Sequence, residues 1–260
     1  MKIALAQTRP VFGDTNANLE KAVAFVRKTD ADLIVFPELF LSGYTFASPG
    51  EAAACSFSPD DGTIDTLLEA GREKNIGICG GYAERDGKLL YNSSFFLADG
   101  KVLANYRKVH LFYHEKEFFT PGDRGFGVFD FRGVAMGMMI CFDWVFPEAA
   151  RSLALKGAQV VLHPSNLVLP YCQRAMYARA LENRVFIVTV NRVGREVNGL
   201  FDNTFTGGSQ LVSPRGEYLV EMNATEEYAE TAAIAPALAL DKNITPMNHL
   251  FKDRREEFYS

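Results

Sequence analysis

The chain of 260 residues lacks the features that mark secreted, membrane-spanning and disulfide-stabilised proteins. It has only four cysteines, none of them in a C-x-x-C pair, so neither a zinc site built on such pairs nor a redox pair is indicated. A disulfide framework is not expected in a chain of this size without a secretion signal. No window is apolar over the length needed to cross a membrane, and the apolar stretch within residues 1–7 is too short for a signal peptide. We therefore expect a cytoplasmic protein.

Charge and histidine spacing argue against two further classes. The formal net charge is -5 and no basic block is present, whereas binding to nucleic acid needs clustered Lys and Arg. The four histidines include no H-E-x-x-H motif. His110 and His114 are spaced to share one helix face, but a third metal ligand is missing. We predict neither a nucleic-acid partner nor a metal site.

What is present is the composition and alternation of an α/β protein. The chain is 48% hydrophobic and 23% charged, has no internal repeat or low-complexity linker, and is read as one domain over residues 1–260. Helices are predicted over 16–28, around 64–71 and after Pro147. Strands are predicted over 3–6, 33–36, 76–82, 89–97, 134–140, 160–162 and 185–190, and hairpin strands over 209–212, 218–221 and 228–234. The alternation predicts an α/β fold, and the late hairpins argue against a purely parallel sheet.

The most informative stretch is residues 133–148, where an apolar run ends abruptly at Cys141. The run is short and bounded by glycine, which predicts a buried strand. Pro147 suits the first position of a following helix and Gly157 its end. A cysteine at such a corner lies near backbone N–H groups that can hold a thiolate and an oxyanion. A lone cysteine usually packs as a small hydrophobe, however, so the function depends on its partners.

Polar residues follow four of the predicted strands at the point where each strand ends. They are Glu38, Cys141, Asn166 and Asn191. Because ligand sites of open α/β sheets lie beyond the carboxyl ends of the strands, we expect a site at this edge.

A polar and aromatic segment over residues 105–123 completes a pattern that resembles the nitrilase superfamily of carbon–nitrogen hydrolases. The resemblance rests on F-P-E at 36–38 with Gly-Tyr at 43–44, Y-R-K-V-H-L at 106–111 with P-G-D at 121–123, and M-I-C-F-D at 139–143 with F-P-E at 146–148. Residues 179–184 also resemble a helix of the family. These blocks occur in the family's order and are jointly specific. The closing segment, 249–259, is similar to a branch of thermostable archaeal nitrilase-like enzymes.

The resemblance implies a four-layer α-β-β-α sandwich and a catalytic triad of Glu38, Lys108 and Cys141. The second glutamate of the family falls on Glu115, with Glu117 a weaker alternative. No metal and no organic cofactor are implied.

The chemistry of these residue types fits the triad. A free thiol is largely protonated at neutral pH, so Cys141 needs a base, and Glu38 can take its proton. Lys108 can stabilise the thiolate and then the oxyanion, with the backbone N–H of Phe142 as a second donor. A thioester on Cys141 would then be hydrolysed by water that Glu38 activates, while Glu115 holds Lys108.

Residues next to the triad in sequence are candidates for the walls of the substrate site. They are Tyr44, Tyr113, Phe142, Trp144 and Asn166. Trp144 suits a core position equally well. The aromatics predict a small, partly apolar acyl group.

The favoured activity is hydrolysis of a small amide to its acid and ammonia. Many true nitrilases have Trp-Glu after the nucleophile, where this chain has Phe142-Asp143, so nitrile hydrolysis is the alternative, followed by hydrolysis of an N-carbamoyl group. An inactive scaffold of the same fold is the non-enzymatic alternative.

The resemblance also implies a homodimer or a higher homo-oligomer. Its contacts are expected from the helix after Pro147 and the helix around 173–184. The charged and aromatic tail, 249–260, is expected to lie across the partner subunit.

Overall fold

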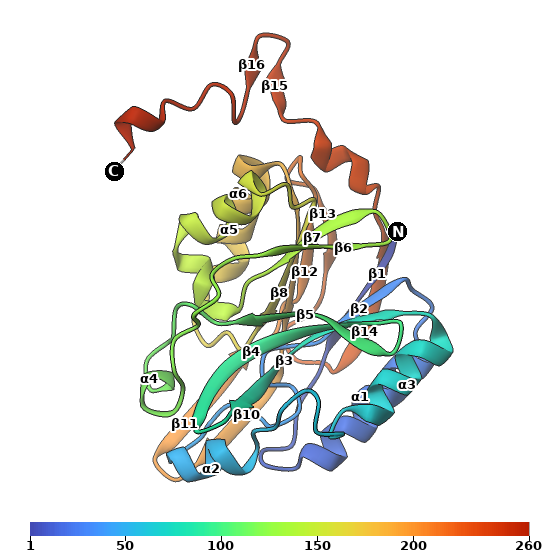
Figure 1. Cartoon of the computed structure of the whole chain (residues 1–260), viewed down its shortest axis with the longest axis vertical. Helices are drawn as coiled ribbons and strands as arrows, with labels where there is room; N and C mark the ends of the chain where they lie inside the picture. The colour runs from blue at the N-terminus through green and yellow to red at the C-terminus, as the bar shows by residue number, and fades with distance from the viewer. Residues whose placement is uncertain (260) are drawn as a thin grey trace.

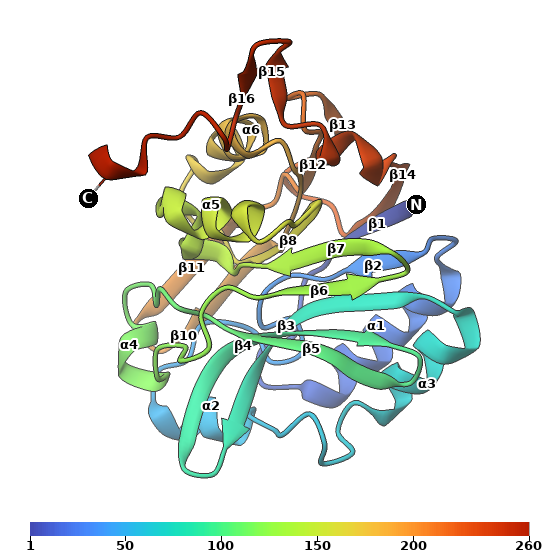
Figure 2. The ribbon, with the colours of Figure 1, turned by 45° about the horizontal axis from the view of Figure 1, so that its top comes forward.

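Two six-stranded sheets lie face to face in the computed structural model, which describes residues 1–259 (Figure 1). In strand order, the first sheet contains β14 (Tyr228–Ala233), β1 (Lys2–Gln7), β2 (Leu33–Val35), β3 (Gly77–Asp86), β4 (Leu89–Ala98) and β5 (Lys101–Arg107). The second contains β13 (Tyr218–Glu221), β12 (Gln210–Val212), β9 (Phe186–Asn191), β8 (Val160–Ser165), β7 (Val134–Met138) and β6 (Val128–Phe131). Helices α1 (Thr15–Lys28) and α3 (Asp65–Lys74) cover the outer face of the first sheet, and α5 (Pro147–Leu155) and α6 (Cys172–Asn183) cover the second (Figures 1 and 2). The four-layer sandwich is confirmed.

The alternation of side chains along β1 shows how one strand serves two layers. Ile3 and Leu5 belong to the large core that includes the space between the sheets, whereas Ala4 and Ala6 pack in the core under α1 and α3. Successive side chains of a strand point to opposite faces, so a sheet covered on both faces needs apolar residues at every position.

The helix signals in the sequence match the helix ends. The side chain of Asp14 accepts a hydrogen bond from the N–H of Ala17 and caps α1. Helix α5 begins at Pro147, and Gly157, with φ of +93°, follows its end. Both signals for α5 are confirmed.

Four details differ from the expectation. The predicted strand 228–234 forms no hairpin with its predecessor; it pairs antiparallel with β1 in the other sheet. Strand β7 stops at Met138, two residues before the expected end, and β8 runs on to Ser165 because it pairs with β9 as far as Asn191. Strand β5 and the hairpin of β10 (Val193–Asn198) and β11 (Phe201–Thr206) had no clear apolar alternation to reveal them.

The strand directions bring the polar strand ends together. Strands β1, β2 and β3 run parallel in one sheet, and β7, β8 and β9 run parallel in the other. The two sheets touch through β3 and β8 and through β1 and β9. Residues that follow β2, β7 and β8 therefore meet at one edge of the sandwich.

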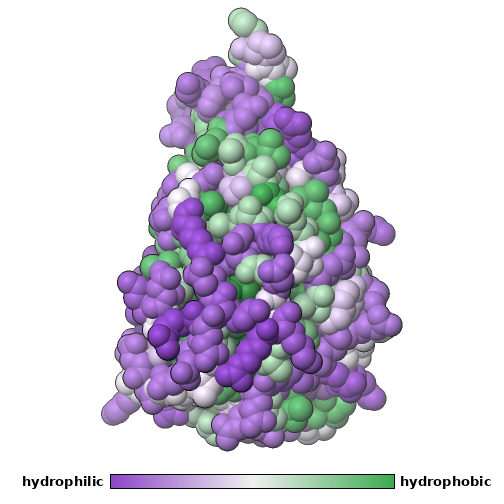
Figure 3. Space-filling view, turned by 90° about the vertical axis from the view of Figure 1, so that its right-hand side faces the viewer, coloured by the Kyte–Doolittle hydropathy of each residue, from purple (hydrophilic) through white to green (hydrophobic). Residues whose placement is uncertain are grey.

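Shorter elements complete the chain: α2 (Pro49–Ala54), α4 (Glu115–Phe118), the 3-10 helices η1 (Cys141–Val145), η2 (Pro236–Leu240) and η3 (Glu256–Phe258), and the strands β15 (Asn243–Thr245) and β16 (Asn248–His249). The C-terminal segment from β15 onward extends beyond the sandwich, past α5 and α6 (Figures 1 and 2). On the side shown in Figure 3, hydrophobic side chains gather in the upper half of the molecule, towards this segment. Within residues 1–259 no helix is both long and apolar enough to span a membrane.

Candidate active site

Glu38 lies in the turn that follows β2, pressed directly onto β3. The N–H of Gly81 donates to the carbonyl of Pro37, and the N–H of Phe40 donates to the carbonyl of Gly81. A Cβ atom at position 81 would lie 2.5 Å from the Cα of Glu38, so only glycine allows this approach. Leu39, with φ of +48°, adopts a left-handed conformation that side chains disfavour. The result is a glutamate with no solvent exposure.

Lys108 follows β5 and is held at the same depth. Its N–H donates to the carbonyl of Asn92, and its carbonyl accepts from the N–H of Gly122. A Cβ atom at position 122 would lie 2.1 Å from the carbonyl oxygen of Arg107. The glycine of the Pro-Gly-Asp turn therefore allows this segment to pass very close to the backbone at Lys108. Arg107 itself points into an ion pair with the buried Glu84 at 2.6 Å.

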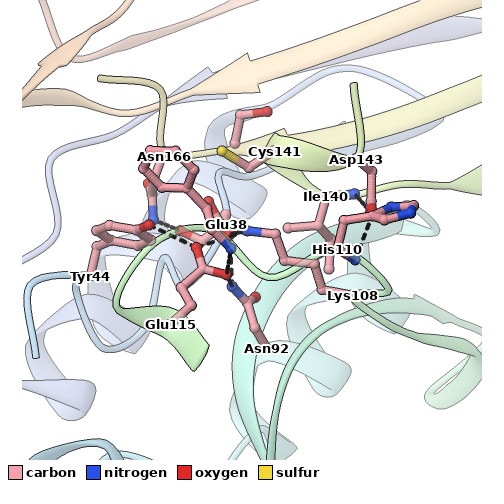
Figure 4. Close-up of polar contacts among 12 residues, drawn as sticks. Glu38, Tyr44, Asn92, Lys108, His110, Glu115, Ile140, Cys141, Asp143 and Asn166 are labelled. Atoms are coloured by element: carbon pink, nitrogen blue, oxygen red, sulfur yellow. Dashed lines mark hydrogen bonds and ion pairs between the residues drawn. The ribbon is translucent and has the colours of Figure 1, made fainter. Parts of the chain in front are cut away.

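The two glutamates meet at the Lys108 ammonium (Figure 4). Its Nζ lies 2.6 Å from Oε1 of Glu38 and 2.8 Å from Oε1 of Glu115. Asn92 donates from Nδ2 to Oε1 of Glu38 at 2.7 Å, and the hydroxyl of Tyr44 donates to Oε1 of Glu115 at 2.7 Å. These three charged side chains are between 0% and 5% exposed, so water screens them little.

Burial and mutual attraction set the protonation of this cluster. Burial of Lys108 by itself lowers its pKa, but the charges of Glu115 and Glu38 outweigh this and raise the pKa above the usual value. Lys108 therefore stays a cation. Burial raises the pKa of Glu38, and Lys108 opposes that rise. A carboxyl with increased proton affinity is suited to accept a proton and return it.

One oxygen of the Glu38 carboxylate is free to accept a proton. Oε1 carries the bonds from Lys108 and Asn92, whereas the buried Oε2 has no hydrogen-bond partner among residues 1–259. Buried polar atoms are nearly always paired, so an unpaired carboxylate oxygen in a charged cluster marks a place for a reacting group.

Cys141 opens η1, directly beyond the second sheet. Its φ of +39° places it in the left-handed region, a strained position for a non-glycine residue. Burial raises the pKa of its thiol well above the usual value, the charge of Glu38 adds to this, and Lys108 acts in the opposite direction. The resting thiol is therefore protonated and needs a base. Asn166 connects the two halves, because its Nδ2 donates to the carbonyl of Glu38 at 2.9 Å.

A polar network that the sequence did not predict fixes the turn at Cys141. Asp143, fully buried, accepts from the N–H of Ile140 at 2.8 Å and from His110 (Figure 4). It also accepts from the hydroxyl of Tyr106 at 2.7 Å. Asp143 and the aromatic and histidine partners of this network all fall within the blocks that carry the resemblance.

His163 holds the other side of this turn, with its Nε2 2.9 Å from the carbonyl oxygen of Cys141. A carbonyl only accepts, so Nε2 carries the proton and Nδ1 accepts from the hydroxyl of Thr189 at 3.0 Å. Burial lowers the pKa of His163 to about 4, so the ring is neutral.

A cavity of about 160 Å³ opens beside Cys141. Its walls are mostly apolar: Phe112, Phe142, Trp144, Val145, Asn166, Leu167, Val168, Leu169 and Tyr171. None of these side chains carries a charge. The wall residues that follow Asn166 were not predicted from the sequence, although the apolar run that they form could have indicated them.

Three other residues predicted from the sequence line a second cavity, which shares Phe112 with the first. Tyr44, Tyr113 and Glu115 line a smaller cavity of about 60 Å³. Tyr113 is 71% exposed. Glu117, the weaker alternative to Glu115, is exposed and contacts His114 at 2.6 Å.

His110 and His114 do not share a helix face. His110 lies in the loop after β5, where it contacts Asp143, whereas His114 precedes α4.

Comparisons with known proteins agree with this architecture. The model of the carbon–nitrogen hydrolase family matches residues 2–240. A nitrilase of Pyrococcus abyssi is 45% identical over 263 aligned residues, covering 100% of this chain and 99% of that protein. An (R)-stereoselective amidase of a Pseudomonas species is 39% identical, covering 87% of this chain and 82% of that protein. Among solved structures, a double mutant of the amidase from Nesterenkonia sp. AN1 in complex with acrylamide has a TM-score of 0.82 and 26% identity, covering 99% of this chain and 95% of that one. The chain therefore belongs to the carbon–nitrogen hydrolases of the nitrilase superfamily.

Proposed function

We propose that this protein hydrolyses small uncharged nitriles to the carboxylic acid and ammonia, with Cys141 as the nucleophile. The observation that carries the chemistry is the unpaired Oε2 of Glu38 in a buried cluster with Lys108 and Glu115. The sequence alone favoured the amide. The full-length similarity to a nitrilase, at 45% identity, supports the nitrile instead.

The proposed reaction consumes two molecules of water. The Cys141 sulfur bonds to the nitrile carbon while its proton passes through Glu38 to nitrogen, giving a thioimidate. Water adds, and ammonia leaves with a proton from Glu38, giving a thioester on Cys141. A second water, deprotonated by Glu38, hydrolyses the thioester and restores the thiol. Lys108 and the N–H of Phe142 stabilise negative charge on the tetrahedral oxygen, and each such donor is worth about 10²- to 10³-fold in rate.

Hydrolysis of the corresponding amide is the second candidate. An amide enters the same sequence at the tetrahedral stage, so it needs no further residue. The 39% identity to an (R)-stereoselective amidase supports it, as does the likeness to an amidase whose structure contains acrylamide.

The cavity supports a small, apolar acyl group for either substrate. Its volume of about 160 Å³ suits a group of a few carbon atoms, and its walls carry no charge that would pair with an ammonium or a carboxylate. Carbamoyl substrates with charged tails are correspondingly disfavoured.

Release of ammonia from matched nitriles and amides tests the proposal, with Cys141→Ala as the control. Release from nitriles that vanishes in the variant would support the nitrile. Release of ammonia from amides alone would support the amidase activity instead. Release from neither, with Cys141 resistant to alkylation by iodoacetamide, would revive the inactive scaffold.

We also propose that the protein forms a homodimer through α5 and α6. Leu155, Tyr177 and Leu181 are exposed hydrophobic side chains on these helices. The tail beyond β16 extends past them and carries Phe258 and Tyr259, 71% and 57% exposed. A second copy of the chain would cover both surfaces.

A further inference from the structure

The hairpin β10–β11 belongs to neither six-stranded sheet, yet it holds the segment that carries Tyr44. Oε1 of Glu196 accepts from the N–H of Tyr44 at 2.8 Å and from the N–H of Thr45 at 2.7 Å. Asn198 donates to the carbonyl of Thr45, and Asn203 donates to its hydroxyl, each at 3.0 Å. The hairpin therefore makes three hydrogen bonds to the backbone of these two residues and a fourth to the side chain of Thr45.

Glu196 is itself held by a buried ion pair. Nη1 of Arg192 lies 2.8 Å from its Oε2, with the two side chains 1% and 5% exposed. The guanidinium carbon lies 4.0 Å from the ring centroid of Phe205. At Gly43, φ is +81° and a Cβ atom would lie 2.7 Å from Oε2 of Glu196. A buried ion pair adds little net stability but can specify one geometry.

The position of Tyr44 matters because its hydroxyl reaches the charged cluster. It donates to Oε1 of Glu115 at 2.7 Å, the same oxygen that contacts Lys108 at 2.8 Å (Figure 4). The other hydrogen bonds to the Glu115 carboxylate, from the N–H of Phe112 and from Asn92, reach Oε2 and are longer, at 3.2 and 3.4 Å.

We infer that Glu196 is a positioning residue for the reaction: it fixes Tyr44, and Tyr44 fixes Glu115 against Lys108. The inference rests on the proposed function and extends it to a residue far along the chain from the triad. Glu196 touches no reacting atom. Its removal should lower kcat without changing the acyl cavity, and therefore without changing KM.

The decisive variant replaces the ion pair by apolar residues of similar size, Arg192→Met with Glu196→Leu. Removing both partners leaves no unpaired buried charge, which avoids the largest destabilisation that a single substitution would cause. The acceptor for the two N–H groups is lost, however. Because a hydrogen bond to a charged group is worth about tenfold to a hundredfold, we expect kcat to fall by about that factor with KM within about twofold.

Tyr44→Phe removes only the hydroxyl and should reduce kcat to a similar extent. When it is added to the double variant, kcat should fall no further, because both changes act on one contact. Asp202→Asn breaks the exposed ion pair with Arg195 on the same hairpin and should leave kcat unchanged. Wild-type kcat in the double variant, or losses that multiply in the triple variant, would overturn the inference.

Two further measurements keep the test independent of folding and of the substrate. Glu196→Asp keeps the charge opposite Arg192 but withdraws the carboxylate, so its loss of kcat should also fail to multiply with that of Tyr44→Phe. The rate of alkylation of Cys141 by iodoacetamide, followed by mass spectrometry, needs no substrate. It should fall several-fold in the Glu196 and Tyr44 variants and stay at the wild-type value in Asp202→Asn. If the wild type reacts with iodoacetamide but releases no ammonia, the proposed function fails while the alkylation rates still test the positioning role. Equal alkylation rates throughout would refute that role.

Discussion

The two sheets contribute opposite kinds of residue to the site. The first sheet and its loops supply the charges: Glu38 after β2, Lys108 after β5, and Glu115 in α4. The second supplies the sulfur of Cys141 and the apolar walls that follow β7 and β8. The bond from Asn166 to the carbonyl of Glu38 is one of the hydrogen bonds that join the two sides. Under the proposed function, proton transfer belongs to the first side and most of the acyl selectivity to the second, with Phe112 of the first side as the exception. The contrast therefore predicts that mutations can separate the two.

The strongest test of this division is Glu38→Gln on the charged side. The variant keeps the shape but loses the base, so kcat should fall by about 10²- to 10⁴-fold. Because the walls are untouched, the factor should be equal for all acyl groups. Steady-state kinetics on a series of nitriles or amides measures it, with the exposed Glu117→Gln as a control that keeps full activity. A loss that varies tenfold along the series would break the division.

The side that carries Cys141 should be sensitive to acid through His163. The pKa of this residue is about 4 in the folded protein against 6.5 for the free side chain. As the pH falls, His163 therefore binds a proton in the unfolded chain before it does so in the folded protein. The stabilisation is complete above pH 6.5 and is lost as the pH falls towards 4, a change of about 3 kcal/mol in the free energy of unfolding.

His163→Gln can still donate to the carbonyl of Cys141 but does not titrate. Urea unfolding between pH 7 and pH 4 should show a shallower decline in the variant than in the wild type. Parallel declines would mean that His163 does not govern the acid sensitivity.

Trp144→Ala should alter selectivity and leave the chemistry intact. The change enlarges the cavity, so the ratio of kcat/KM for a bulky acyl group to that for the smallest should rise about tenfold. The kcat for the smallest substrate should stay within about threefold. Tyr177→Ala on α6 removes an aromatic that does not line the cavity, and it should leave the ratio unchanged. An unchanged ratio in Trp144→Ala would assign this residue to the core.

The smallest kinetic effect is expected from removing residues 249–260. We expect kcat per site to change less than twofold, while the proposed dimer loosens and elutes later on size exclusion as the protein is diluted. An unchanged elution volume would argue against a role of the tail in assembly.

The fold was largely predictable because its central strands are continuous apolar runs with punctuated ends. The expectation that residues 228–234 join a hairpin was wrong for a topological reason. Local pattern identifies a strand, but its partner, β1, lies more than 200 residues earlier and leaves no local trace.

The candidate site could be proposed from the sequence where strand ends coincide with sequence blocks, as at Glu38 and Cys141, which the structure brings to one edge. Asn92 was missed because it lies within a strand, β4, whose pattern gives no reason to single it out. Glu196 was missed because its partners are backbone N–H groups of a distant loop, which no spacing of side chains reveals.

The uncharged walls beside Cys141 have a consequence for turnover. The proposed reaction turns a neutral molecule into an acid that ionises at neutral pH. That anion would face a cluster in which two carboxylates outnumber the single ammonium of Lys108, beside walls that cannot solvate it. Product should therefore leave readily, and the enzyme should show little inhibition by the carboxylate it makes even as product accumulates.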